Sequence, residues 1–143
     1  MTTKVEVIHT PDLSTAVERP VFLARVPGVF PSPADDYLEG KLDLNQYLIK
    51  HPAATFFVRV TGDSMIGAGI HSGDLLIVDR SLEPKDGNVV IASVDGELTV
   101  KRLSLRQGKL VLLPDNDKYQ PMEVGGETAF EVWGVVTNVI HPL

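Results

Sequence analysis

The chain is organised around one stretch, residues 60–79, which reads Val-Thr-Gly-Asp-Ser-Met-Ile-Gly-Ala-Gly-Ile-His-Ser-Gly-Asp-Leu-Leu-Ile-Val-Asp. The apolar run that ends at Val60 is typical of a strand, and Gly62 and Asp63 then indicate a turn. Ser64 follows, ahead of a second glycine cluster and a second apolar run. A serine in such a turn can stand clear of the sheet, near backbone N–H groups, as a nucleophile requires. The alternative is a polar turn whose serine caps a short helix.

Lys101 lies in a second informative stretch, residues 96–105, which reads Gly-Glu-Leu-Thr-Val-Lys-Arg-Leu-Ser-Leu and predicts a strand. The strand period of two places Lys101 on one face with Thr99, Leu103 and Leu105. A lysine among apolar neighbours is expected to be partly buried, which lowers its pKa and suits it to act as a general base. The alternative is a lysine with a buried stem and a solvated ammonium. Arg102, on the opposite face, is interpreted as a surface cation.

Together the two stretches resemble the peptidase family of LexA-type repressors and UmuD-like mutagenesis proteins, whose members use a Ser–Lys dyad. The resemblance covers nearly the whole chain and rests on these segments: Phe30–Tyr37, Asp43–Gln46, His51–Val58, Gly62–Met65, Ser72–Asp79, Thr99–Arg102 and Trp133–Val136. It is strongest to the UmuD-like branch, in which a short arm stands where LexA-type repressors carry a DNA-binding domain. The family fold that this implies is mostly β: a curved antiparallel LexA/signal-peptidase-like domain with one short helix and an extended N-terminal arm.

The dyad predicts a specific chemistry. Neutral Lys101 would take the proton from Ser64, and Ser64 Oγ would attack a peptide carbonyl to give an acyl-enzyme that water hydrolyses. Backbone N–H groups of Ser64 and Asp63 would stabilise the oxyanion. No histidine, metal or cofactor is required.

The resemblance implies self-processing. UmuD-like proteins cut their own arm when bound to a RecA–single-stranded DNA filament, and the trimmed homodimer then serves a UmuC-type translesion polymerase in the SOS response. The family's scissile bond lies between a small residue and Gly, directly before Phe-Pro-Ser-Pro. Here Pro27, Gly28 and Val29 precede Phe30, so the pattern is altered. Two bonds are candidates, Pro27–Gly28 and Gly28–Val29. We favour the second, because the stiff Pro-Ser-Pro run that follows should set the register.

Composition limits the class of protein. Apolar residues make up 43% of the 143 residues, which favours a globular fold. The net charge of −6 argues against direct, sequence-specific DNA binding, which usually shows a basic face. There is no cysteine, and the four histidines are scattered without metal-ligand spacing. No signal-like or membrane-spanning run appears, so we expect a cytoplasmic protein without a membrane partner.

The pattern along the chain predicts an arm over residues 1–34 that carries the self-cleavage region, and a β domain over residues 35–143. Prolines interrupt the arm, which is interpreted as extended and docked on another surface. A short helix is predicted from Asp43 to Ile49. The predicted strands are Thr55–Thr61, Asp74–Asp79, Asn88–Val94, Glu97–Leu105, Lys109–Leu113, Glu123–Val124 and Phe130–Ile140.

Three other functions are compatible with parts of this pattern. One is a non-cleaving interaction or regulatory β module with an idle dyad, which the altered cleavage sequence would favour. Another is a signal-peptidase-like enzyme that acts on other proteins, which would need a membrane anchor or an exposed apolar platform. The third is a LexA-type repressor, which would need an N-terminal helix-turn-helix that about 30 proline-punctuated residues do not supply.

Overall fold

A computed structural model describes residues 2–22 and 38–143 of the chain. The chain divides into two compact units. The main unit combines the N-terminal residues up to Pro11 with His51–Leu143, and the smaller unit comprises Asp12–Lys50. The predicted cleavage residues Pro27, Gly28 and Val29 lie outside the described residues.

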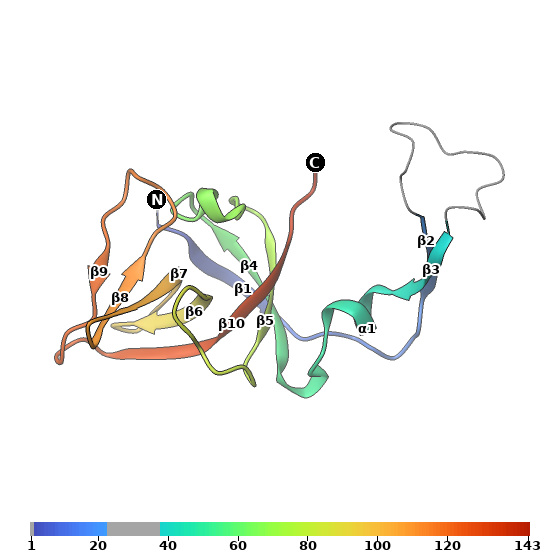
Figure 1. The fold of residues 1–143 in the computed structure, drawn as a ribbon, viewed down its shortest axis with the longest axis horizontal. Helices are drawn as coiled ribbons and strands as arrows, with labels where there is room; N and C mark the ends of the chain where they lie inside the picture. The colour runs from blue at the N-terminus through green and yellow to red at the C-terminus, as the bar shows by residue number, and fades with distance from the viewer. Residues whose placement is uncertain (1, 23–37) are drawn as a thin grey trace. The chain divides into compact units, whose positions relative to one another are not determined.

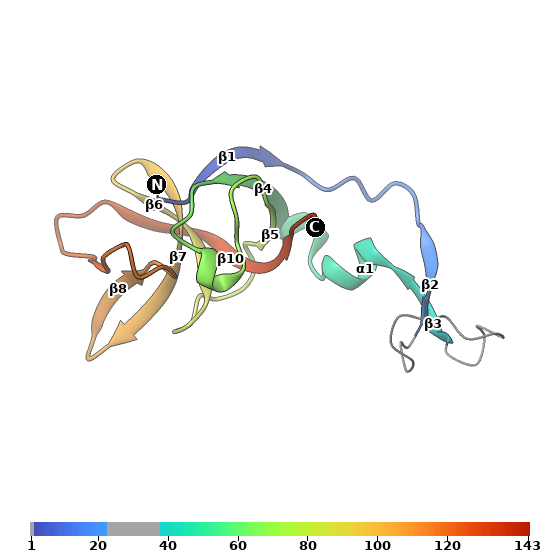
Figure 2. The ribbon, with the colours of Figure 1, turned by 90° about the horizontal axis from the view of Figure 1, so that it is seen from above.

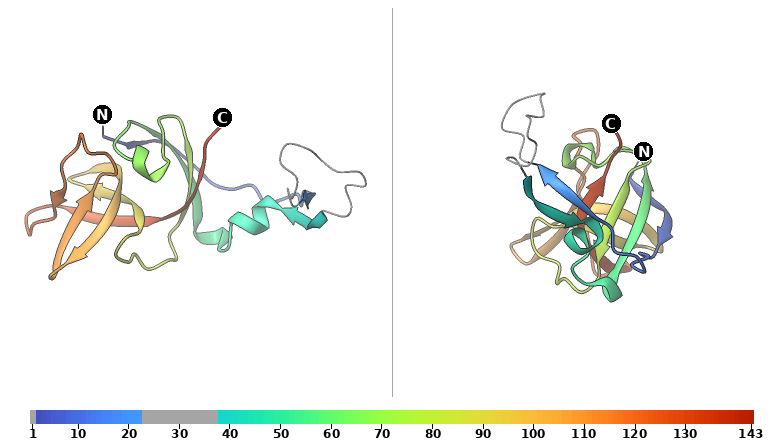
Figure 3. Two further views of the ribbon diagram at one scale, coloured as in Figure 1. Left: turned by 45° about the horizontal axis from the view of Figure 1, so that its top comes forward. Right: turned by 90° about the vertical axis from the view of Figure 1, so that its right-hand side faces the viewer.

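The main unit is an antiparallel eight-stranded sheet with the order β1-β4-β5-β10-β6-β7-β8-β9 (Figure 1). Its strands are β1 (Lys4–His9), β4 (Thr55–Thr61), β5 (Leu75–Asp79), β6 (Val89–Val94), β7 (Glu97–Arg106), β8 (Lys109–Leu113), β9 (Met122–Glu123) and β10 (Phe130–Ile140). Strand β1 pairs along β4 and also touches β7 at Lys4 and Thr99. The sheet therefore curls into a barrel-like form, which is seen end-on in the right-hand view of Figure 3. The predicted mostly β, curved antiparallel fold is confirmed.

Two apolar clusters fill this unit. The first contains Phe56, Val58, Val60, Met65, Ile70, Leu76, Val78, Ile91 and Val100, and the second contains Val90, Ala92, Leu103, Leu112 and Val135. Strands β6 and β7 contribute side chains to both clusters, because successive side chains point to opposite faces of a strand. Lys101 is next to Val100 in sequence and so belongs to the other face of β7, where it is also buried.

The predicted strands match the structure closely. β4, β8 and β10 have the predicted limits, β5, β6 and β7 differ by one residue at one end, and β9 is shifted by one residue. The strands β1, β2 and β3 were not predicted. Leu105 departs from the expected pattern, because it is 52% exposed near the end of β7 instead of joining the buried row.

Each of the two hairpin turns of β6, β7 and β8 places a glycine and the residue before it at positive φ. Asp95 and Gly96 have φ values of 49° and 84° and join β6 to β7 in a two-residue hairpin. Gln107 and Gly108 do the same between β7 and β8, with φ values of 52° and 75°. These turns set the register of β6, β7 and β8 and therefore the position of Lys101 relative to the residues on its neighbouring strands.

The smaller unit contains β2 (Glu18–Phe22), β3 (Leu38–Asp43) and α1 (Leu44–Leu48). Strands β2 and β3 form an antiparallel pair. Asp43 begins the helix, since its side chain accepts the Asn45 N–H at 2.9 Å. The observed helix is one residue shorter at each end than the predicted Asp43–Ile49, because these two residues are its caps.

The short 3-10 segments η2 (Pro52–Ala54) and η3 (Ile66–Ala68) flank β4. In the described part of the chain, no helix is both long and apolar enough to cross a bilayer.

Candidate active site

Ser64 lies in the turn between β4 and η3. Gly62 has a φ of 108°, a conformation that favours glycine, and it turns the chain out of β4 just before the serine. Ser64 is fully buried, and Met65 packs beside it in the first apolar cluster. The Gly-Asp-Ser-Met sequence thus holds the serine hydroxyl at one end of the barrel-like sheet.

Lys101 reaches this hydroxyl from β7. Its Nζ lies 3.4 Å from Ser64 Oγ, and the residue is only 6% exposed. Burial lowers the pKa of Lys101 to about 8, while the nearby negative charge of Glu97 acts in the opposite direction. The structure therefore brings together the two residues that the sequence singled out, and it places the lysine where a large neutral fraction exists at mildly alkaline pH.

A loop between β8 and β9 holds the serine turn from outside. The Asp115 N–H donates to the Ser64 carbonyl at 2.8 Å, and Asn116 Nδ2 donates to the Asp63 carbonyl at 2.9 Å. A carbonyl and the following N–H share one peptide plane, so the bond to Asp63 also sets the direction of the Ser64 N–H. The Tyr119 hydroxyl donates to the Asp63 carboxylate and lowers the pKa of that group. Sequence reasoning missed this loop, although its Pro-Asp-Asn-Asp run is a turn signal.

Arg102 corrects one sequence interpretation. It is not an ordinary surface cation, because its Nε and Nη2 both donate to one oxygen of Asp115, at 3.1 and 2.7 Å. Its Nη1 also donates to the Gly87 carbonyl at 2.7 Å. Since Asp115 holds the Ser64 carbonyl, Arg102 buttresses the serine turn from the opposite face of the strand that carries Lys101.

The N-terminal segment covers the pair. The Thr3 N–H donates to Ser64 Oγ at 2.8 Å, and Thr3 is fully buried. Its carbonyl accepts the Val100 N–H at 3.1 Å and the Thr99 hydroxyl at 2.9 Å. Sequence reasoning predicted docking of the arm but not its place. The alternating Lys-Val-Glu-Val run from Lys4 was the available signal.

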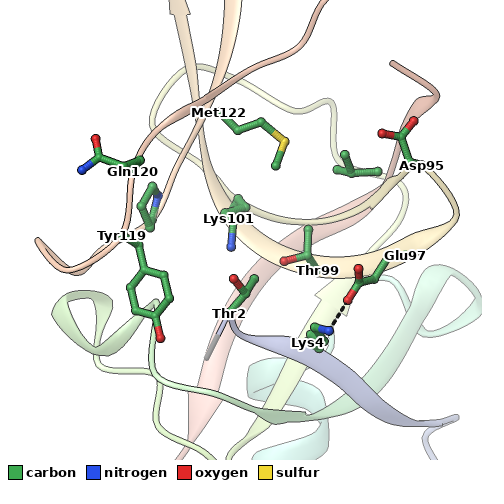
Figure 4. A pocket seen from close by; sticks show the side chains of 11 residues that line it. Thr2, Lys4, Asp95, Glu97, Thr99, Lys101, Tyr119, Gln120 and Met122 are labelled. Atoms are coloured by element: carbon green, nitrogen blue, oxygen red, sulfur yellow. Dashed lines mark ion pairs between the residues drawn. The ribbon is translucent and has the colours of Figure 1, made fainter. Parts of the chain in front are cut away.

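A cavity of about 390 Å³ opens beside Lys101 (Figure 4). Figure 4 shows Thr2 and Lys4 of the N-terminal segment on one side of it and Tyr119 and Met122 on another, with Lys101 between them. Lys4 and Glu97 form an ion pair of 2.5 Å at its edge. The cavity therefore extends from Lys101 to the N-terminal segment, which lines it through Thr2 and Lys4.

Asp79 has a structural role. It is buried at the end of β5, where it accepts the Ser81 N–H and hydroxyl and pairs with His51 at 2.6 Å. Burial alone would raise its pKa, but the bonds from Ser81 and His51 outweigh that effect and lower it. These contacts give Asp79 a structural role at the end of β5.

Metal-ligand geometry appears at one place in the described residues. His71, Asp74 and His141 bring one ligand atom each within 4.8 Å of one another. The four histidines looked scattered in sequence, but the fold brings two of them to the same carboxylate.

Comparison with known proteins identifies the family of this chain. The Peptidase S24-like family model matches residues 20–137. Protein SamA of Salmonella typhimurium is 52% identical over 122 residues, which cover 85% of this chain and 84% of that protein. Protein ImpA of Escherichia coli is 51% identical over 123 residues, covering 86% and 83%. Protein MucA of Escherichia coli is 40% identical over 143 residues, covering 98% and 97%. The chain therefore belongs to the Peptidase S24-like family, as a UmuD-like member of the LexA/UmuD group.

Proposed function

We propose that this chain is a SOS mutagenesis protein that cuts its own N-terminal arm with Ser64 as nucleophile and Lys101 as general base. The observation that carries the proposal is the buried contact of 3.4 Å between Ser64 Oγ and Lys101 Nζ, combined with a lysine pKa of about 8. Near pH 8 about half of the Lys101 side chains would be neutral amines, and a neutral amine can accept the serine proton without a histidine. In this proposal residues 1–34 are the arm and residues 35–143 the peptidase-like domain.

The proposed cleavage proceeds in two steps. Lys101 takes the Ser64 proton while Oγ bonds to the Gly28 carbonyl carbon, and the oxyanion is held by the N–H groups of Asp63 and Ser64. The Gly28–Val29 bond then breaks, and the Val29 nitrogen takes the proton back from Lys101. A water that Lys101 deprotonates next attacks the Gly28 ester and frees Ser64. The products are an arm that ends at Gly28 and a protein that begins at Val29.

The proposed partners follow from the family. We propose that a RecA–single-stranded DNA filament stimulates the cleavage in the cytoplasm. The trimmed homodimer would then act as the accessory subunit of a UmuC-type translesion polymerase. The acidic net charge of −6 fits a protein that reaches DNA through such partners and not through a basic surface of its own.

A second candidate function is an interaction module with an idle dyad. Full burial of Ser64 beneath Thr3 favours it, because no substrate carbonyl can reach Oγ in this arrangement. The two candidates differ in one observable, which is whether the arm is ever lost.

Intact mass spectrometry of the purified chain tests the proposal. Samples are incubated from pH 7 to pH 10, alone and with RecA, ATP and single-stranded DNA. We expect slow loss of the arm that accelerates as Lys101 deprotonates, and faster loss with the filament. Ser64→Ala and Lys101→Ala should each abolish it, since the two residues act as a unit. Cleavage that persists in Ser64→Ala would refute the dyad, and no cleavage under any condition would select the idle module.

N-terminal sequencing of the trimmed protein decides the bond. We expect a start at Val29. A start at Gly28 would select the Pro27–Gly28 bond, and a start outside residues 27–30 would refute the register argument.

A further inference from the structure

The N-terminal segment, with Thr3 just ahead of β1, occupies the place that any substrate of the Ser64–Lys101 pair would need. A reacting carbonyl must come within about 3–3.5 Å of the nucleophile, and Thr3 N already lies 2.8 Å from Ser64 Oγ. Both residues are fully buried, so no second chain segment fits between them. Figures 1 and 2 both show β1, drawn in blue, running along β4 at this end of the sheet.

The strand is held in a register that does not react. Because the Thr3 N–H points at Oγ, the oxygen lies near the plane of the Thr2–Thr3 peptide, whereas attack on a carbonyl carbon comes from above that plane. The next carbonyl, that of Thr3, is held by Val100 and Thr99 on β7. Neither peptide bond beside Thr3 is therefore presented to Ser64 for attack.

The strand pairs with β4 from Lys4 to His9, but its side chains and its contacts to β7 hold it only lightly. Only its first residues are covered, and Val7 and Ile8 are 41% and 43% exposed. The Lys4–Glu97 ion pair is at the surface, where such pairs add little. The Thr3 hydroxyl is buried without a hydrogen-bond partner among the described residues, which weakens the docked state.

We propose that residues 2–9, which comprise Thr3 and β1, are a built-in, non-cleavable occupant of the substrate groove, and that self-cleavage requires this segment to detach from Ser64 and β7. This inference rests on the proposed function for its consequence, since it makes arm release and not chemistry the step that a stimulating partner would accelerate. It also predicts that the arm contributes two competing ligands to one groove: residues 2–9, which block it, and the segment around Gly28, which is cut.

A reversible lock tests the consequence for cleavage. Lys4 and Thr61 are opposite each other on β1 and β4, and cross-strand partners lie within disulfide range. The chain has no cysteine of its own, so Lys4→Cys/Thr61→Cys forms a single defined bridge. All samples are reduced before the mass is measured, so that a cut arm still held by the bridge is counted as cut. We expect the arm to be cut at least about tenfold more slowly during incubation of the oxidised protein than during incubation of the reduced protein. The control is Thr61→Cys alone, whose rate should not depend on oxidation. Equal rates in the oxidised and reduced double variant would overturn the inference.

A second measurement needs no cleavage and so separates this inference from the proposed function. Ser64→Cys provides the chain with one thiol, and its alkylation by iodoacetamide reports how often β1 uncovers that position. Adding Thr3→Pro removes the covering N–H and should speed alkylation severalfold. Adding Thr3→Val removes only the unpartnered hydroxyl and should slow it. Equal alkylation in all three proteins would overturn the inference even if the arm is cut. The expected order would support it even if the arm is never cut.

A separate group of side chains carries an independent proposal. His141 follows β10, and the β10–β5 register pairs Ile140 with Leu75, next to Asp74. His141 Nδ1 lies 2.6 Å from Asp74 Oδ1, and His71 Nδ1 lies 3.7 Å from Asp74 Oδ2. The two imidazole rings are 4.5 Å apart, and the Asp74 side chain is 2% exposed.

The geometry points to a site for a divalent transition metal such as Zn²⁺, bound by His71, Asp74 and His141. Two imidazoles and one carboxylate favour zinc, nickel or copper over magnesium or calcium. The backbone N–H of His71 donates to Asp74 Oδ2 at 2.7 Å and orients the carboxylate. Ligands in metal sites are commonly oriented by such additional hydrogen bonds. Both imidazoles are partly exposed, at 49% and 41%, so they can rotate the short distance to a shared ion and leave a position open to water.

Calorimetric titration of the full chain with ZnCl₂ tests this site. We expect saturable binding of one ion per chain, weakened at least about tenfold by His71→Gln and by His141→Gln. His51→Gln is the matched control, because His51 also lies 2.6 Å from a buried aspartate but has no second histidine beside it. Binding that is absent, unsaturable, or as sensitive to His51→Gln as to the other two changes would overturn the proposal.

Discussion

The amine of Lys101 is a titratable group that is largely buried, so its protonation affects the free energy of unfolding. Its pKa falls from 10.5 to about 8 on folding, so the unfolded chain binds the proton more tightly. The penalty is complete below pH 8 and fades as the pH rises toward 10.5. At pH 7 it amounts to at most about 3 kcal/mol, since one pKa unit is about 1.4 kcal/mol.

Lys101→Met should therefore leave the free energy of unfolding at pH 7 unchanged or raise it by up to about 3 kcal/mol. Urea unfolding at pH 7 and at pH 10 measures this, and any gain should shrink at the higher pH. A large loss of stability at pH 7 would show instead that Lys101 is a structural cation whose partners satisfy it.

Arg102 provides a second test at the level of one side chain. Arg102→Ala frees Asp115, which holds the Ser64 carbonyl, so it should slow self-cleavage about tenfold. The pH at which cleavage is half-maximal should not move, because Lys101 keeps its burial. Arg106→Ala, an exposed change on the same strand, is the control and should leave the rate unchanged. A rate loss accompanied by a shifted pH midpoint would mean that Arg102 acts on Lys101 and not through the serine turn.

Among the secondary-structure elements, η3 and the β8–β9 loop meet at a glycine that tolerates no side chain. A Cβ at Gly67 would lie 2.7 Å from the Asp115 carbonyl oxygen, a backbone atom that cannot easily move. Gly67→Ala should destabilise the protein by about 2 kcal/mol and lower the melting temperature by about 4–8 °C. Gly125→Ala is the control, because nothing lies within 4 Å of its Cβ position. Equal melting temperatures for the two variants would show that the loop yields and does not clamp η3.

Over the whole molecule, stability should be divided unequally between the two units. The main unit contains both apolar clusters, whereas in the described part of Asp12–Lys50 only Asp43 and Ile49 are buried. Native-state hydrogen exchange should therefore show β2 and β3 amides exchanging through local opening that depends little on urea. Amides of β6 and β7 should exchange only through global unfolding. Equal protection in both units would show that they unfold as one cooperative body.

The sequence by itself determined the strands of the main sheet from Thr55 onward, the hairpin at Asp95-Gly96 and the identity of the two candidate residues, but it did not predict β1. These depend on local rules, namely apolar alternation, residues that accept positive φ, and a lysine within an apolar row. The resemblance to LexA-type and UmuD-like proteins added the expected fold and the family, and both are confirmed.

Only the tertiary structure decided what surrounds Ser64. The Thr3 contact joins positions 61 residues apart, and the pairing of His141 with Asp74 joins positions 67 apart. Such contacts depend on strand order and register across the closed sheet, which no local pattern encodes. For the same reason the sequence pattern predicted Arg102 to be a surface cation. The structure shows that it binds Asp115 in the β8–β9 loop. The local sequence pattern predicts where a strand lies and which side chains share a face. Which residues those side chains contact is determined only when the sheet closes.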